Sequence, residues 1–175
     1  MKGDQMELQR YIGIELSGLK MAMGRALDSL TQQEVIWRPA SGCNSIGIIL
    51  LHVARSEDSF IQGMLQSKPQ IWKSEKWYEK LNLAEEEDGA HFTMDQVNAF
   101  QVPQLSDIMA YYDAVRVITK ERLRAMALED FDKKVTFPHF GEAPAASIFS
   151  FLIAHTSQHI GEISYLRGMQ RGMDK

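Results

Sequence analysis

Cysteine is almost absent from this sequence, since Cys43 is the only one among 175 residues. A single thiol can form neither an intrachain disulfide nor a zinc site built on cysteine thiolates. Scarce cysteine without a disulfide framework is typical of proteins in a reducing compartment. We therefore expect a cytoplasmic protein.

Long apolar runs are also missing. No stretch approaches the roughly 18 apolar residues that a membrane-spanning helix needs. The opening residues MKGDQMELQR contain no apolar core and no small-residue cleavage site, both of which a secretory signal would have. We therefore expect neither export nor contact with a membrane.

A strong charge of either sign is a third absence. The chain has 19 basic and 23 acidic residues and a formal net charge of -4, so it lacks the cationic field that attracts nucleic-acid phosphates. We expect no nucleic-acid partner. A length of 175 residues with 45% hydrophobic content predicts a single globular domain over residues 1–175.

Apolar residues recur every three or four positions in four long segments, which predicts four amphipathic helices. These segments cover residues 8–30, 46–64, 105–126 and 147–168. Thr31 and Glu34 have the spacing of a capping box, which predicts a short helical turn before Pro39. Four long helices with little strand signal indicate an all-α four-helix bundle.

Two stretches, 67–103 and 131–144, lack this periodicity. We expect them to be long irregular connections between the second and third and between the third and fourth helices, the kind of segment that often carries function. Residues 94–100 favour a short helix and residues 134–137 an extended segment. The acidic run 85–88 lacks the ligand spacing of a calcium loop, and we expect it to be solvated.

Three histidines fall on helical faces that we expect to point into the bundle. His155 and His159 are four residues apart, which places them one turn apart on one face of the last helix. Glu162 follows on the same stripe, which also carries buried apolar positions. His52 interrupts the apolar run of the second helix. Side chains from facing helices can meet in a bundle, so His52, His155 and His159 could hold one metal ion and leave positions open for water or substrate.

A metal-free interpretation also fits these residues. A lone histidine on an apolar face is usually a hydrogen-bonded core residue, and the three could satisfy one another by hydrogen bonds. Thr156 stands where the zincin helix has its catalytic glutamate, which argues against a metalloprotease of that class. His91 and His139 fall in the two irregular connections, where we expect loop positions.

Three sequence motifs resemble the DinB superfamily, the DinB/YfiT-like proteins. They are Trp-Arg-Pro at 37–39, Ser-Ile-Gly-Ile-Ile-Leu-Leu-His at 45–52, and His-Thr-Ser-Gln-His-Ile-Gly-Glu at 155–162. The resemblance runs from the first helix to Gly168. It implies a four-helix bundle of DinB/YfiT type that is often a homodimer, with a divalent ion at His52, His155 and His159. Zinc and nickel are the first choices of ion, with manganese and iron as alternatives.

The same resemblance implies a metal-dependent enzyme that acts on a small molecule, either as a thiol transferase using a low-molecular-weight thiol or as a hydrolase. One departure is Glu162, where family members often have glutamine. Its carboxylate could be a fourth ligand, an acceptor that orients a histidine, or a general base. The alternative function is a stress-associated binding module that the ion stabilises without catalysis.

Overall fold

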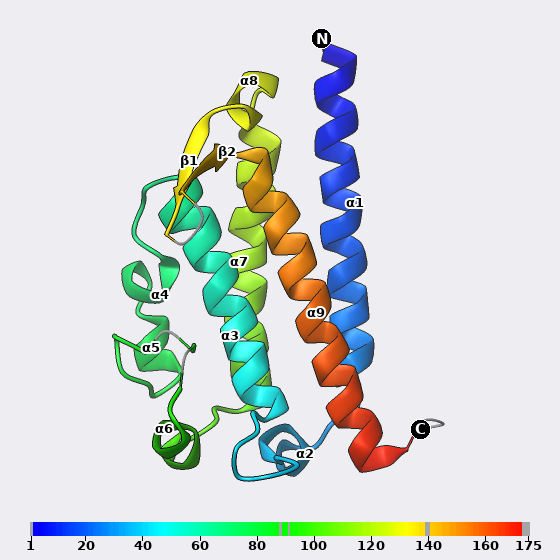
Figure 1. The fold of residues 1–175 in the computed structure, drawn as a ribbon, viewed down its shortest axis with the longest axis vertical. Helices are drawn as coiled ribbons and strands as arrows, with labels where there is room; N and C mark the ends of the chain where they lie inside the picture. The colour runs from blue at the N-terminus through cyan, green and yellow to red at the C-terminus, as the bar shows by residue number, and fades with distance from the viewer. Residues whose placement is uncertain (1, 88, 91, 139–140, 173–175) are drawn as a thin grey trace.

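The computed structural model describes residues 2–172 apart from 88, 91, 139 and 140, and this part of the chain is mostly helical (Figure 1). Its helices are α1 (Lys2–Leu27), α2 (Gln32–Ile36), α3 (Ile46–Asp58), α4 (Ile71–Ser74), α5 (Trp77–Lys80), α6 (Met94–Ala99), α7 (Leu105–Ala125), α8 (Leu128–Phe131) and α9 (Ala146–Arg171), with the π-helix η1 (Ser59–Leu65). Within the described residues, no helix has the length and apolar character that a membrane crossing requires.

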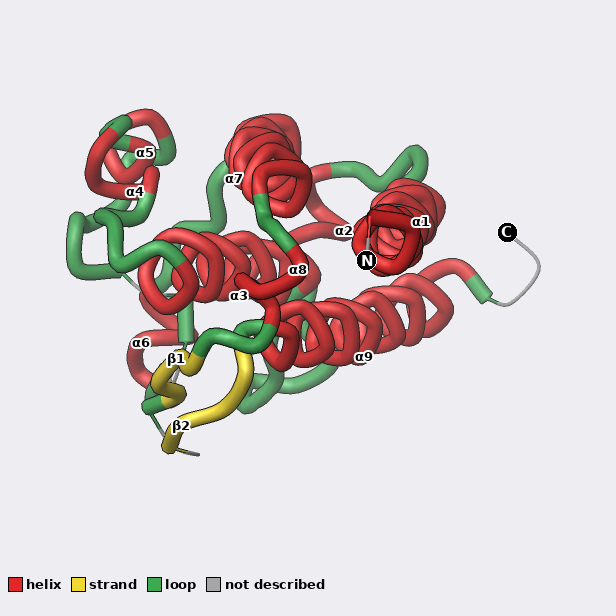
Figure 2. The backbone as a smooth tube through the Cα atoms, turned by 90° about the horizontal axis from the view of Figure 1, so that it is seen from above, coloured by secondary structure: helices red, strands yellow, loops and turns green. Residues whose placement is uncertain are grey.

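The longest helices α1, α3, α7 and α9 lie side by side, as the view from above shows (Figure 2). In Figure 1, α1 and α9 run downward while α3 and α7 run upward, so the members of each pair are parallel. Parallel neighbours need a connection that returns along the molecule. Residues 66–104, with α4, α5 and α6, make that return beside α3.

Side-chain caps set the starts of several helices. The Thr31 hydroxyl accepts a hydrogen bond from the Glu34 amide, and the Glu34 carboxylate accepts one from the Thr31 amide at 2.7 Å. The predicted capping box is thus confirmed. At α3 the Ser45 hydroxyl accepts from the amide of Ile48 at 3.3 Å. These caps satisfy amides that have no partner within their helix.

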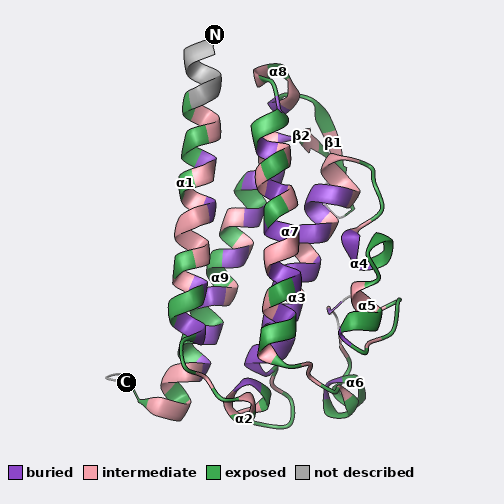
Figure 3. Ribbon diagram, turned by 180° about the vertical axis from the view of Figure 1, so that it is seen from behind, coloured by how far each residue is buried: buried purple, intermediate pink, exposed green. Residues whose placement is uncertain are grey.

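Buried residues lie on the sides of the long helices that face one another (Figure 3). The buried apolar residues form two clusters. One includes Leu50 on α3 and Ile163 on α9, and the other includes Leu16 on α1 and Leu152 on α9. Large aromatic side chains from the connection and from α7 complete the first cluster. Trp72, Tyr111 and Tyr112 are fully buried there and act as core residues.

A buried ion pair joins α3 to α7. Arg116 donates to Glu57 at 2.7 Å and to the hydroxyl of Tyr112 at 2.8 Å, while the second Glu57 oxygen accepts from Thr119 at 2.6 Å. Burial raises the pKa of Glu57, and Arg116 opposes that rise. Both carboxylate oxygens are therefore satisfied inside the bundle.

Asp58, the next residue, anchors the returning connection. Its two oxygens accept hydrogen bonds from the amides of Ile71 and Trp72 at 3.1 and 3.0 Å, at the start of α4. The same carboxylate accepts from the hydroxyl of Tyr111 at 2.8 Å. One buried carboxylate therefore ties α3, α4 and α7 together.

The structure adds two details to the predicted elements. Residues 134–137 are extended, but they pair with residues 141–144 as an antiparallel hairpin, β1 (Lys134–Phe137) and β2 (Gly141–Pro144), so the fold is not purely α-helical. The second strand carries Gly and Pro at its ends, which hid the strand pattern. The second helix is also not uniform, because its α-helical part ends at Asp58 and η1 continues it.

Candidate metal centre

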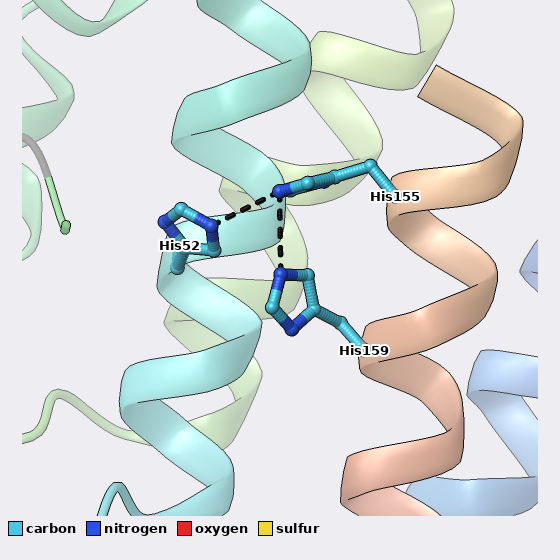
Figure 4. Close-up of side chains that lie close together, drawn as sticks. All are labelled: His52, His155 and His159. Carbon is cyan, nitrogen blue, oxygen red and sulfur yellow. Dashed lines mark hydrogen bonds between the residues drawn. The ribbon is translucent and has the colours of Figure 1, made fainter. Parts of the chain in front are cut away.

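Three imidazoles converge between α3 and α9 (Figure 4). His52 comes from the middle of α3, and His155 and His159 come from successive turns of α9. The Nε2 atom of His155 lies 3.1 Å from Nε2 of His52 and 3.2 Å from Nε2 of His159. The three candidate ligand atoms all lie within 4.8 Å of one another. The structure thus brings together the three histidines singled out in the sequence.

The two short spacings match those between ligands of one metal ion. With metal–nitrogen bonds of about 2.0–2.1 Å, two ligands of a tetrahedral zinc ion stand about 3.3 Å apart. The observed 3.1 and 3.2 Å are close to that value. Neutral imidazole nitrogen is a good ligand for zinc, nickel, copper and iron. The donor set therefore fits a divalent transition-metal ion.

Hydrogen bonding alone accounts for this arrangement less well. A neutral ring nitrogen has either one proton to donate or one lone pair to accept with. Nε2 of His155 has two close nitrogen neighbours, so a neutral cluster satisfies only one of the two contacts fully. A shared cation would accept the lone pairs of all three rings at once.

The surroundings of His155 keep its ring uncharged. Phe151 stacks beside the ring with the centroids 5.9 Å apart, and Phe60 of η1 meets its edge at 5.8 Å. Burial, with smaller contributions from His159 and His52, lowers the pKa of His155 to about 4. Its Nδ1 atom is buried without a hydrogen-bond partner. The aromatic contacts therefore fix the orientation of this ring.

Glu162 contacts the outer nitrogen of His159 and does not join the converging nitrogens. Nδ1 of His159 donates to the carboxylate at 2.7 Å, which leaves Nε2 of that ring as the acceptor that points into the cluster. The sequence placed Glu162 on an interior stripe, and this is wrong, because the side chain is 54% exposed. Glu162 lies at the edge of that stripe, on the solvent side of His159.

A cavity of about 330 Å³ opens beside His52 and His159. It is lined by Asn44, Ile48, Ile49, His52, Gly89, Ala90, Phe92 and His159. Gly89 has a positive φ of 71°, and a Cβ there would stand 3.3 Å from the Cα of His52. The connection can approach α3 this closely because the residue is glycine.

Hydrogen bonds to the main chain hold this part of the connection in place. Arg55 donates from Nε to the carbonyl of Glu87 at 3.1 Å, and the indole of Trp72 donates to the carbonyl of Glu85 at 2.9 Å. The acidic run was expected to be only solvated, but its backbone is anchored to the core. The sequence did not predict these backbone contacts or the close approach of Gly89 to α3. The one available signal was a lone glycine directly after an acidic run. His91 and His139 lie outside the described residues.

Comparisons with known proteins bear on the family and the fold of this chain. The sequence model of the DinB superfamily matches residues 16–163. No curated protein sequence matches the chain. The crystal structure of a conserved protein from Enterococcus faecalis superposes with a TM-score of 0.81 at 22% identity, covering 94% of this chain and 97% of that one. That similarity shows a common fold.

Proposed function

This chain belongs to the DinB superfamily, and from that premise we propose that it is a divalent-metal-dependent enzyme acting on a small molecule by thiol transfer or hydrolysis. His52, His155 and His159 would hold the ion, with zinc or nickel as first choices and manganese or iron as alternatives. The observation that carries the proposal is the convergence of three imidazole nitrogens beside a cavity of about 330 Å³.

An ion at this centre would supply Lewis acidity and would lower the pKa of a water or thiol bound to it. The chain's own residues prepare the site for it. Glu162 holds the proton of His159 on Nδ1, so that Nε2 presents its lone pair. Phe60 and Phe151 pack against the ring of His155 and hold it in place. A small molecule would enter from the cavity side, next to His52 and His159.

The alternative is a binding module in which the ion joins α3 to α9 without catalysis. Structural zinc sites usually close the coordination sphere with four protein ligands, whereas catalytic ones use three. Among the described residues, the converging donors are the three histidines, and two of them border the cavity. These two observations favour an enzyme over a purely structural ion.

Elemental analysis of protein purified without a histidine tag tests the centre. We expect near-stoichiometric metal in the parent, loss of metal in His52→Ala and in His155→Ala, and retention in Gln158→Ala, a control on the exposed side of α9. Thiol-transfer and hydrolysis substrates are then screened with loaded and stripped protein. Absence of metal after reconstitution, or turnover that survives removal of both the metal and His52, would contradict the proposal.

We also propose that a second copy of the chain packs on the outer face of α1 and α9. Tyr11, Ile14 and Met21 are large apolar residues exposed on α1. Tyr165 and Met169 are exposed on the neighbouring α9. Large exposed apolar residues on neighbouring helices are compatible with packing against a second copy. Light scattering should find a dimer in the parent and a monomer in Met21→Glu.

A further inference from the structure

A second cavity of about 400 Å³ adjoins the one beside the histidines. Ile48 lines both cavities, and the neighbouring residues Asn44 and Ser45 line one each. The rings of Phe92 and Phe100, which also belong to one cavity each, lie 5.1 Å apart. The two cavities therefore lie next to each other along the first turns of α3. The contact between Phe92 and Phe100 joins the wall of one cavity to the wall of the other.

The second cavity is polar where the first is mostly apolar. Apart from Ile48 it is lined by Gln32, Ile36, Arg38, Ser45, Val97, Asn98, Phe100, Gln101, Val102 and Gln104. Its wall is built by close packing: a Cβ on Gly47 would collide with the Val102 side chain, so glycine lets the end of the connection rest on α3. Gln32 fixes the same segment by donating to the carbonyl of Pro103 at 2.9 Å.

Arg38 is the one cationic side chain among the residues that line either of these two cavities. It donates to the carbonyl of Ser41 and to the side-chain oxygen of Asn98, both at 3.0 Å. These neutral acceptors hold the guanidinium in place without neutralising it. Arg116, by contrast, is neutralised by Glu57. Arg38 pairs with no carboxylate among the described residues, and three of the five donors of a guanidinium remain for a ligand.

We propose that Arg38 binds an anionic group, a carboxylate, at the far end of the small molecule whose reacting end lies at the three histidines. The inference rests on the proposed function for the reacting end. A guanidinium suits a carboxylate because it can donate two parallel hydrogen bonds. Asn98, Gln101 and Gln104 add amide groups to the same cavity.

The rise of α3 gives an approximate length for such a molecule. Ser45 in the second cavity precedes His52 by seven residues, which at 1.5 Å per residue is about 10 Å along α3. Between these ends the path borders Ile48 and Phe92, so the middle of the molecule is expected to be uncharged. A carboxylate carried about three peptide units from the reacting group has this span.

The probes are N-acetyl-cysteinyl-glycyl-glycine, whose thiol and carboxylate are about 10 Å apart when extended, and its C-terminal amide. Full-length protein with cobalt(II) in the centre is titrated with each probe. Calorimetry gives the affinities, and the cobalt–thiolate absorption reports whether the thiol reaches the centre. We expect the acid to bind about tenfold more tightly than the amide, as is typical of a charge-assisted pair.

Variants assign that preference to one side chain. Arg38→Gln should abolish the preference and leave the affinity for the amide unchanged, and Arg38→Lys should retain part of it. Arg10→Gln removes the same charge from an exposed position on α1 and should keep the full preference. Thermal melting of each variant confirms that it is folded.

The two proposals fail in different ways. Equal binding of acid and amide to the parent, or a preference that survives in Arg38→Gln, overturns the role of Arg38 even if the thiolate absorption appears. A preference that depends on Arg38 without any thiolate absorption supports the anion site and contradicts the centre. If neither probe binds, the combined site is refuted.

Discussion

Helix α3 carries polar side chains into its interfaces with α7 and with α9. The two interfaces differ in how fully the hydrogen bonds of these side chains are satisfied. Toward α7, both oxygens of Glu57 accept hydrogen bonds from Arg116 and Thr119. Toward α9, Nε2 of His155 lies 3.1 Å from Nε2 of His52 and 3.2 Å from Nε2 of His159, and one neutral ring nitrogen satisfies only one of these two contacts fully. Both oxygens of the Glu57 carboxylate are thus satisfied within the protein, whereas the imidazole cluster leaves a contact that a ligand could satisfy.

The α7 interface should be the more sensitive to a single substitution. Arg116→Met would leave Glu57 buried without its partner and should lower the free energy of unfolding by about 3–5 kcal/mol. Chemical denaturation measures this loss. The double variant Glu57→Leu/Arg116→Met removes both charges and should recover most of it. If the single variant is as stable as the parent, the ion pair does not have the structural role assigned to it.

The contribution of the α9 interface to stability should depend on bound metal. At a free ion concentration about 100 times the dissociation constant, binding should raise the free energy of unfolding by about 2.7 kcal/mol. Thermal melting with and without chelator measures the gain, and His155→Ala should remove it. Arg116 variants that still fold should keep the metal-dependent gain. A gain of equal size in His155→Ala would place the ion elsewhere.

A substitution of Glu162 tests its role as an acceptor that orients His159. Because it contacts the outer nitrogen of His159, Glu162→Ala should weaken metal affinity by about 10–100-fold, as is usual when such a partner is removed. Competition with a chelator of known affinity measures the change. Glu121→Gln is the charge control, since it removes an exposed carboxylate from α7, a helix that carries none of the three histidines. Unchanged affinity in Glu162→Ala would assign this carboxylate another role.

Gly89 tests how closely the connection must approach the centre. Alanine at a positive φ costs about 1–2 kcal/mol, and here its Cβ would press on His52. We expect Gly89→Ala to lower stability by about that amount and to weaken probe binding in the adjoining cavity. Gly141→Ala at the start of β2, where φ is also positive and a Cβ meets nothing within 4 Å, is the matched control. Equal effects of the two would show that the contact at Gly89 is unimportant.

Much of the helical framework could be predicted from local patterns. The spacing of four between His155 and His159 fixes their common face, and the apolar run around His52 indicates that this residue turns inward. The capping box at Thr31 and the short helix α6 were predictable for the same reason, because their signals lie within a few residues.

Features that depend on distant packing could not be predicted. The path of the connection decides that Gly89 rests on His52 and that Phe92 borders the cavity. The exposure of Glu162 depends on which side of α9 the neighbouring helices cover. The position of Arg38 in a cavity could not be predicted, because α6 and the end of the connection form the other walls of that cavity.

The packing of α1 on α9 has a consequence for synthesis of the protein. About 120 residues separate the end of α1 from the start of α9, so a ribosome working at about 5–20 residues per second leaves the first helix without its partner for several seconds. During that time the apolar stripe of α1 is open to chaperones and to other nascent chains. We expect the bundle to close only after translation of the last helix, and the three histidines to meet at the same moment.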